Sequence, residues 1–253
     1  MRILPRVPLR AISFDLFDTL VDIHMGRLPL VEIAGRRIPS TYGLLHAASV
    51  HWHGLDFESF AGHLGAVDRE FRDRLQGQHV EVATFERFRE LGRRIGHDSD
   101  ELANTLTDTH MGELRRHIAY LPHHAPLLER LHRRVKLGLC SNFSHTDTAL
   151  AVLDEAGLLP HFDAVVVSMD LGIRKPRPEI FQAVLQLLEV DAEDSLHVGD
   201  SLEADVAGAA PLGFETVWLT RRVSEPRAAL EAWTGKQPMH VIADLAELED
   251  LLD

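Results

Sequence analysis

The sequence has little of what stabilises a secreted fold or crosses a membrane. Its 253 residues contain a single cysteine, Cys140, so no internal disulfide can form and a reducing compartment is expected. No apolar run approaches the roughly 20 residues that a membrane-spanning helix needs. The N-terminal segment MRILPRVPLR holds two prolines and no apolar stretch of signal-peptide length. We therefore expect a soluble cytoplasmic protein with no membrane partner.

Positive charge is also scarce. The chain has 26 Lys and Arg residues against 39 Asp and Glu residues, which gives a formal net charge of −13. Nucleic-acid-binding proteins usually present a basic face, so this balance argues against a nucleic-acid partner. It also requires that an anionic substrate be held by local positive groups, because the overall field repels it. The proportions of hydrophobic residues (45%) and charged residues (26%) are ordinary for a globular protein.

The stretch RAISFDLFDTLVD, residues 10–22, combines a buried-strand signal with a carboxylate at its end. Its apolar run over 11–14 suits a strand of a parallel sheet, and Asp15 follows directly. Open α/β sheets bind their ligands at the carboxyl ends of such strands. A turn or capping aspartate is the alternative for Asp15.

The rest of the chain shows two patterns. From residue 122 onward, strand-like apolar runs alternate with helical segments, which predicts βαβ units and a parallel sheet. Between residues 23 and 121, apolar residues recur at intervals of three and four. This spacing predicts helices over 57–75, 85–95 and 102–118, after a short alternating segment at 31–38 that suits a hairpin.

These patterns predict an α/β fold with two domains. Residues 1–22 and 122–253 are expected to form a Rossmann-like core around a parallel sheet. Residues 23–121 are expected to form an inserted, all-helical domain, because the apolar stripes of its helices need one another for burial. The length of the chain is compatible with this division.

Polar side chains follow three further core strands. Ser141 and Asn142 end the second strand, Lys175 lies in the loop after the third, and Asp200 and Asp205 follow the fourth. In a parallel sheet these ends emerge on one edge, together with that of the first strand. The sequence therefore predicts one site that contains carboxylates, a hydroxyl, an amide and a lysine.

This combination of groups suits phosphoryl transfer. Asp15 and Asp200 offer the hard oxygen ligands that Mg²⁺ prefers. The metal and Lys175 would offset the repulsion between a carboxylate and a phosphate dianion. Ser141 and the backbone N–H groups near Asn142 can donate to phosphoryl oxygens. Asp15 could then act as a nucleophile and form an acyl phosphate.

Four stretches, DLFDTL, CSN, RKPRP and GDSLEAD, occur in this order. Together they resemble motifs one to four of the haloacid dehalogenase (HAD) superfamily of hydrolases, and the insert after the first resembles the family's C1-type helical cap. The resemblance covers the chain from about Arg10 onward. It implies a hydrolase in which Asp15 is the nucleophile, Thr19 supports it, Ser141 and Lys175 bind phosphate beside Asn142, Asp200 binds the metal, and Asp205 holds the metal's waters or Lys175. Helix capping by Thr19 and Asp205, and a solvated loop position for Lys175, are the alternatives.

One position departs from the family pattern. HAD phosphatases usually carry a second aspartate, the general acid/base, two residues after the nucleophile, where this chain has Phe17. The backbone carbonyl of Phe17, which in the family helps to bind Mg²⁺, survives this substitution. General acid–base catalysis is typically worth about 10²–10⁴-fold, so slow turnover is expected. Asp18 is a poor substitute, because a shift by one residue changes the direction of the side chain.

These observations leave three hypotheses. The first is a Mg²⁺-dependent phosphatase of a small phosphate monoester, working as a monomer or a homodimer. The second is a 2-haloacid dehalogenase, because those relatives carry an aromatic residue at the position of Phe17 and release a halide that needs no proton. They dispense with the metal, however, and replace the aspartate that Asp200 represents here. The third is a weakly active protein that binds a phosphorylated ligand or a protein partner.

Other polar residues could bind a substrate or metal but are better explained as surface or packing residues. Arg27, Arg36 and Arg37 lie in the segment 23–39 and could reach an anionic group of a substrate. His46, His51 and His53 include a His-x-His pair, but no neighbouring carboxylate or cysteine completes a transition-metal site. His145 lies near the predicted site, and Cys140 is expected to be a buried small side chain.

Overall fold

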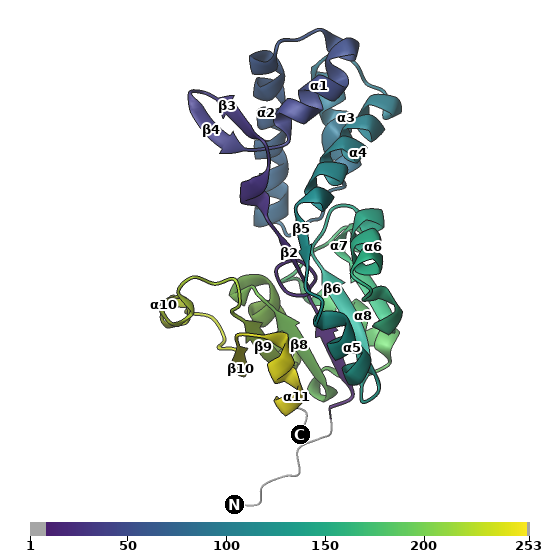
Figure 1. Cartoon of the computed structure of the whole chain (residues 1–253), viewed down its shortest axis with the longest axis vertical. Helices are drawn as coiled ribbons and strands as arrows, with labels where there is room; N and C mark the ends of the chain where they lie inside the picture. The colour runs from purple at the N-terminus through teal and green to yellow at the C-terminus, as the bar shows by residue number, and fades with distance from the viewer. Residues whose placement is uncertain (1–8, 252–253) are drawn as a thin grey trace, which may run out of the picture.

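The computed structural model describes residues 9–251, and of residues 74–76 only the helical backbone. The lower part of the molecule in Figure 1 is a sheet flanked by helices, and the upper part is a helical insert. The prediction about a signal peptide rests mainly on residues 1–8, outside the described part of the chain. Within residues 9–251 no helix is long and apolar enough to cross a membrane.

The six-stranded sheet is parallel throughout, with β1 inside it. Its strand order is β10-β9-β8-β1-β6-β7, and each neighbouring pair runs in the same direction. The parallel sheet predicted from the alternation of strands and helices is thereby confirmed. The strands are β1 (Ala11–Phe14), β6 (Lys136–Ser141), β7 (Ala164–Val167), β8 (Ser195–Gly199), β9 (Glu215–Leu219) and β10 (His240–Ile242).

Strand β1 is apolar along its length because both faces of the sheet are covered. Ile12 and Phe14 point to one side and Ala11 to the other, as the alternation of a strand requires. The first side packs against α5 (His124–His132), α6 (Thr146–Glu155) and α11 (Leu248–Leu251), and the second against α8 (Pro178–Leu188) and α9 (Ala207–Ala209). Two further helices, α7 (Ser168–Leu171) and α10 (Pro226–Ala232), complete this part.

The segment after β8 differs from the single helix that its apolar spacing predicts over 202–210. It begins as a π-helical turn over Leu202–Val206 and continues as the short helix α9. The backbone N–H groups of Asp205 and Val206 both donate to the carbonyl of Ser201. This wider turn directs the Asp205 side chain back toward Ser201, whose backbone N–H donates to it at 3.0 Å. Such π-turns are frequent at functional sites.

The insert has its own hydrophobic core. Phe60, Leu64, Phe88, Leu91 and Leu106 are buried together with side chains of the same helices. Its elements are the hairpin β3 (Leu30–Ile33) and β4 (Arg36–Pro39), then α1 (Tyr42–His53), α2 (Phe57–Gly77), α3 (Thr84–Arg94) and α4 (Asp100–Arg116). The insert is therefore helical except for the hairpin that the alternation at 31–38 predicts and for the short strand β5 (Ile118–Tyr120), where the expected helix over 102–118 has already ended. The division of the chain at residues 22 and 121 stays a prediction.

Two of the contacts between the insert and the core are short antiparallel pairings of the backbone. At the neck, β2 (Val21–Ile23) pairs antiparallel with β5 (Ile118–Tyr120) where the chain leaves and re-enters the core (Figure 1). Beyond α2, residues 79–81 run antiparallel to the core loop 172–174. Glu81 N–H donates to the Gly172 carbonyl at 3.0 Å, and Arg174 N–H donates to the His79 carbonyl at 3.1 Å. We call this second contact the bridge.

Candidate active site

Lys175 lies at the centre of the predicted site. Its ammonium nitrogen Nζ donates to Asp15 Oδ1 at 2.6 Å and to Asp205 Oδ1 at 2.7 Å. Asp15 comes directly after β1, Asp205 comes from the π-turn after β8, and Lys175 comes from the loop after α7. The lysine is 3% exposed, so both ion pairs are shielded from water. The two carboxylates hold the pKa of Lys175 well above its usual range, although burial acts in the opposite direction.

Asn142 fixes the loop that carries this lysine. Its amide oxygen accepts from the backbone N–H of Lys175 at 2.7 Å, and its amide nitrogen donates to the Lys175 carbonyl at 3.1 Å. Both functional groups of the side chain are therefore used on the backbone. Asn142, predicted to bind substrate, supports the lysine in this structure.

The third carboxylate, Asp200, joins Asp15 and Asp205 in a compact group. One oxygen atom of each lies within 4.8 Å of those of the others. Burial raises the pKa of Asp200 to about 8, with the charges of Asp15 and Asp205 adding to the effect. Burial also raises the pKa of Asp15 to about 6, although Lys175 opposes this shift. Three carboxylates thus surround one ammonium group, and the cluster is short of positive charge.

The donor set of this cluster fits a divalent cation with a preference for hard oxygen ligands. Both oxygens of Asp205 are already engaged, Oδ1 with Lys175 and Oδ2 with the backbone of Ser201. The Asp200 side chain makes no hydrogen bond among the described residues, and Asp15 and Asp200 each offer a carboxylate oxygen to the cluster. Mg²⁺ is bound by one or two carboxylates with waters and carbonyls completing its shell, which matches the groups available here.

Two residues of the predicted site have buried hydroxyl groups without a hydrogen-bond partner among the described residues. Thr19 Oγ1 and Ser141 Oγ are shielded from solvent and make no hydrogen bond within the described chain. Buried polar atoms are nearly always hydrogen-bonded, because an unpaired one loses its interaction with water. Ser141 ends β6, next to β1, where it was predicted to donate to a phosphoryl oxygen. The unpaired hydroxyl of Ser141 is compatible with that prediction.

The ring of Phe17 makes an apolar contact at the position where the family usually has an acid. It packs on the ring of Phe143, with the centroids 4.6 Å apart. The neighbouring Asp18, expected to be a poor substitute for the acid, makes contacts of its own. Its Oδ1 lies 2.9 Å from Arg222 Nε and accepts from the backbone N–H of Ile23 at 3.1 Å. Asp18 adopts a positive φ of 61°, which aspartate tolerates better than most residues.

His197 extends the site into the sheet. Its Nε2 lies 3.1 Å from Asp205 Oδ1, and its Nδ1 lies 2.7 Å from Ser13 Oγ. Burial lowers the pKa of His197, against the effect of Asp205. Because a carboxylate can only accept, the neutral imidazole donates through Nε2 and accepts from the Ser13 hydroxyl at Nδ1. In the sequence, His197 differs from its neighbours only as a polar residue in an apolar strand. The structure pairs it in register with Ser13, a polar residue of the adjacent strand.

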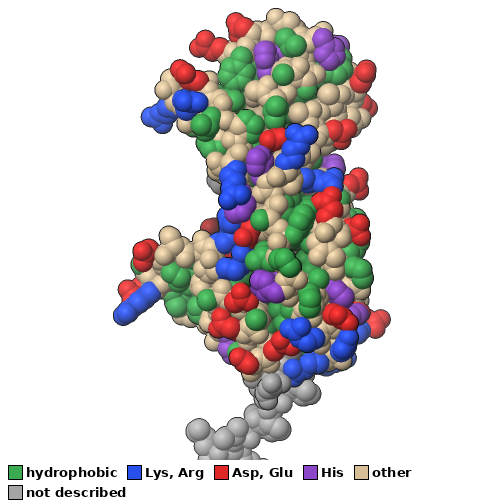
Figure 2. Space-filling view, viewed as in Figure 1, with side chains coloured by type: hydrophobic (Ala, Val, Ile, Leu, Met, Phe, Trp, Pro, Cys, Tyr) green, Lys and Arg blue, Asp and Glu red, His purple; other side chains and the backbone are tan. Residues whose placement is uncertain are grey.

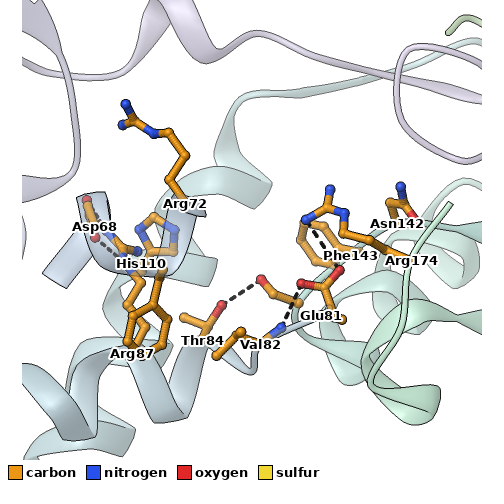
Figure 3. A pocket seen from close by; sticks show the side chains of 12 residues that line it. Asp68, Arg72, Glu81, Val82, Thr84, Arg87, His110, Asn142, Phe143 and Arg174 are labelled. Atoms are coloured by element: carbon orange, nitrogen blue, oxygen red, sulfur yellow. Dashed lines mark hydrogen bonds and ion pairs between the residues drawn. The ribbon is translucent and has the colours of Figure 1, made fainter. Parts of the chain in front are cut away.

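Two cavities open between the insert and the rim of the sheet. One of about 500 Å³ is lined by Lys175, Asn142, Arg174, Arg72 and Glu203, among others. The other, of about 350 Å³, is shown in Figure 3. Both have a size suited to a small ligand.

Residues 9–213 match the family model of the haloacid dehalogenase-like hydrolases. The chain belongs to this family. The HAD hydrolase is 31% identical over 248 residues to the ribulose-1,5-bisphosphate 5-phosphatase of Halopiger xanaduensis, covering 96% of this chain and 98% of that one. It is 34% identical over 150 residues to the phosphoserine phosphatase of Thermus thermophilus, covering 58% and 59% of the two chains.

Solved structures share the fold of the HAD hydrolase. A 2-haloacid dehalogenase from Pseudomonas syringae superimposes with a TM-score of 0.69 at 24% identity, covering 96% of this chain and 98% of that one. The HAD-hydrolase YfnB from Bacillus subtilis, bound to magnesium, gives a TM-score of 0.60 at 21% identity, covering 98% and 100%. Because phosphatases and dehalogenases share this fold, the reaction has to be argued from the site.

The structure shows the surroundings of the other residues singled out in the sequence of this HAD hydrolase. Arg27, Arg36 and Arg37 are exposed, the last two on β4. His145 accepts from the backbone N–H of Thr148 and so caps α6. The histidines near α1 pack in the insert: His46 Nε2 lies 2.8 Å from the Leu55 carbonyl, and the ring of His53 stacks on Phe60. Burial raises the pKa of Cys140 to about 12, so its thiol is not a ready nucleophile.

Proposed function

We propose that this HAD hydrolase is a Mg²⁺-dependent phosphatase of small phosphate monoesters, with Asp15 as the nucleophile. The observation that carries the proposal is the contact of Lys175 with Asp15 and Asp205 beside the unpaired carboxylate of Asp200. A structural ion pair alone would not need a third, partly buried acid next to it. Identity to phosphatases over most or much of the chain supports the same reaction class.

Asp15, Asp200 and the backbone carbonyl of Phe17 would hold the metal, which supplies charge neutralisation to the bound phosphoryl group. Lys175, Ser141 and Thr19 would contact the phosphoryl oxygens or the Asp15 carboxylate and keep them in place. Asp205 keeps Lys175 charged and oriented. His197 and Asn142 would not contact the substrate. His197 would position Asp205, and Asn142 would position the backbone of Lys175.

The reaction divides into two displacements at phosphorus. A carboxylate oxygen of Asp15 attacks, the ester P–O bond breaks, and an aspartyl phosphate forms. The alcohol leaves with a proton taken from water, because Phe17 has none to give. Water then attacks the phosphorus of the aspartyl phosphate, which releases inorganic phosphate and restores the Asp15 carboxylate. Both proton transfers rely on solvent, so slow turnover is expected.

The test measures phosphate release from an aryl phosphate with Mg²⁺ and with excess chelator. Metal-dependent release that disappears in Asp15→Asn supports the proposal. No metal-dependent release, or release that Asp15→Asn retains, refutes it. The substrate screen should include ribulose bisphosphate, phosphoserine and pyrimidine nucleotides, which the names of the relatives give as their substrates. We also propose a cytoplasmic monomer or homodimer divided into core and cap at residues 22 and 121.

A 2-haloacid dehalogenase is the second candidate, and Phe17 favours it. Halide departure needs no proton, so the missing acid would cost nothing in that reaction. Asp15 would attack carbon and displace the halide, and water would then cleave the resulting ester. Halide release from a short 2-haloacid in excess chelator would support this activity. A third outcome, thermal stabilisation by a phosphate compound without turnover of any substrate, would indicate a binding protein.

A further inference from the structure

The two cavities between insert and core share part of their walls. Arg72 of α2, Asn142 and Arg174 line both of them. The larger cavity also touches Lys175, and the smaller one reaches into the insert as far as His110 of α4. A ligand with one group beside Lys175 can therefore extend along Asn142 into the space between the two arginines.

Neither arginine is fully used by the protein. Arg72 is exposed and makes no hydrogen bond or ion pair within the described residues. Arg174 Nη1 lies 3.7 Å from Glu81 Oε2, beyond hydrogen-bond distance, and that oxygen already accepts from the Ser168 hydroxyl at 2.5 Å. Figure 3 shows Arg72 and Arg174 on opposite sides of the cavity, one on the insert and one on the core.

A third arginine, which lines the smaller cavity, differs from these two because its guanidinium is fully paired. Arg87 of α3 donates to both oxygens of Asp68, through Nε at 2.6 Å and Nη2 at 2.8 Å. This pair neutralises itself and fixes α3 against α2. Its guanidinium is therefore occupied, whereas those of Arg72 and Arg174 keep donors that match the paired oxygens of a phosphate or carboxylate.

The walls of the cavities are less negative than the whole chain. Apart from Lys175, which is paired with Asp15 and Asp205, they carry three arginines against three carboxylates, in a protein with a formal net charge of −13. Figure 2 shows Lys and Arg side chains gathered at the waist where the insert meets the core. Positive groups focused in a cleft attract an anion that the overall field repels. The charged residues of the two walls are Arg72, Arg87, Arg174, Lys175, Asp68, Glu81 and Glu203.

We propose that Arg72 and Arg174 form a subsite for a second anionic group of the substrate. This inference rests on the proposed phosphatase function and specifies its substrate class: a small phosphate monoester with a phosphate or carboxylate at its other end. The scissile phosphate lies beside Lys175, and the second anion lies between the two guanidinium groups. Because one arginine comes from each side, such a substrate also holds the insert against the core.

The test compares substrates that differ only at the far end. Propyl phosphate has one anionic group, propanediol bisphosphate adds a phosphate, and phosphonooxypropanoate adds a carboxylate. In the wild type, kcat/KM is expected to be higher for the two doubly anionic esters by about tenfold or more, as expected for hydrogen bonds to charged groups. Arg72→Gln and Arg174→Gln should lower this ratio toward one, mainly through KM. Arg69→Gln, an exposed arginine of α2 outside both cavities, is the matched control and should keep the ratio.

The outcomes separate the two proposals. Equal kcat/KM for all three esters, or a ratio unchanged in Arg72→Gln, overturns the subsite and leaves the phosphatase function standing. Failure of every ester to release phosphate overturns the phosphatase function. In that case, calorimetric binding of propanediol bisphosphate to wild type and Arg72→Gln decides the subsite on its own. Equal affinities would refute it. Because Arg174 is partly buried, the melting temperature of Arg174→Gln shows whether that variant is folded.

Discussion

The hydroxyl of Ser13 on β1 lies 2.7 Å from the imidazole Nδ1 of His197, its register partner on β8. This bond sets the ring so that Nε2 faces Asp205, which in turn bonds to Lys175. The interior of the sheet thereby determines the position of the ammonium group at its edge.

Removing that hydroxyl should affect catalysis as well as stability. Ser13→Ala leaves the buried Nδ1 without a donor, which costs about 1–3 kcal/mol in the free energy of unfolding. Because the ring is then free to turn, kcat should fall while KM changes little. Urea denaturation and steady-state kinetics measure the two effects. Ser195→Ala, which removes a strand hydroxyl bonded to the Asp191 carbonyl, is the control and should lower stability only. Equal kcat in both variants would contradict the role of Ser13.

Restoring an acid at position 17 should accelerate substrates with poor leaving groups. Phe17→Asp places a carboxyl group where the family usually has its general acid/base, and such a group contributes about 10²–10⁴-fold. The gain should be large for alkyl phosphates and small for nitrophenyl phosphate, whose leaving group needs little protonation. Phe17→Leu, which keeps the position apolar, should show no gain. A uniform increase over both substrate types would indicate an effect on binding instead of proton transfer.

Because three carboxylates lie close together, we expect the effect of Asp200→Asn on thermal stability to depend on whether Mg²⁺ is present. In excess chelator at neutral pH, Asp200→Asn should raise the melting temperature, because it removes a carboxyl group whose ionisation is opposed in the folded state by burial and by two neighbouring carboxylates. Mg²⁺ should stabilise the wild type through binding to the native state but should shift Asp200→Asn far less. Thermal unfolding over a series of Mg²⁺ concentrations tests both expectations. If Mg²⁺ shifted the melting temperature of the variant as much as that of the wild type, Asp200 would not be a metal ligand.

His110 should make the protein less stable in acid. Burial, with a smaller effect of Arg87, lowers the pKa of His110 to about 3, whereas an unfolded histidine has a pKa of about 6.5. Between these values the unfolded state binds the extra proton, so the contribution of His110 to stability falls as pH falls. Between pH 7 and pH 4, the unfolding free energy of the wild type should therefore decrease more than that of His110→Asn.

A neighbouring substitution provides the control for this pH dependence. Thr41→Val removes the hydroxyl that lies 2.8 Å from His110 Nδ1 and introduces no titratable group. Its effect on stability should be nearly the same at each pH. If His110→Asn gave an equally flat profile, the histidine would not titrate differently in the folded and unfolded states.

The groups that meet at the sheet edge could be predicted because their positions follow from a general rule. Asp15, Lys175 and Asp200 each come after a parallel strand, and the carboxyl ends of such strands share an edge. The motif order then identified the family. The strands themselves were evident from short apolar runs, since a sheet covered on both faces has no polar side.

What could not be predicted depends on side-chain direction and on packing between distant elements. Asn142 could face either a ligand or a backbone, and only the folded loop shows that it holds Lys175. The π-turn at Leu202–Val206 has an ordinary helical spacing of apolar residues, so its irregularity was not apparent. Arg72 reaches the cavities because of how α2 lies over the core, which periodicity along the helix does not determine.

The bridge ties the position of the insert to the loop that carries the lysine. Only Arg174 separates Ile173, which pairs with Val80 of the insert, from Lys175. Any swing of the insert about the neck must either break the hydrogen bonds at His79 and Glu81 or pull this loop along. A change in the position of the insert should therefore change the position of the ammonium group, and weakening the bridge should loosen both together.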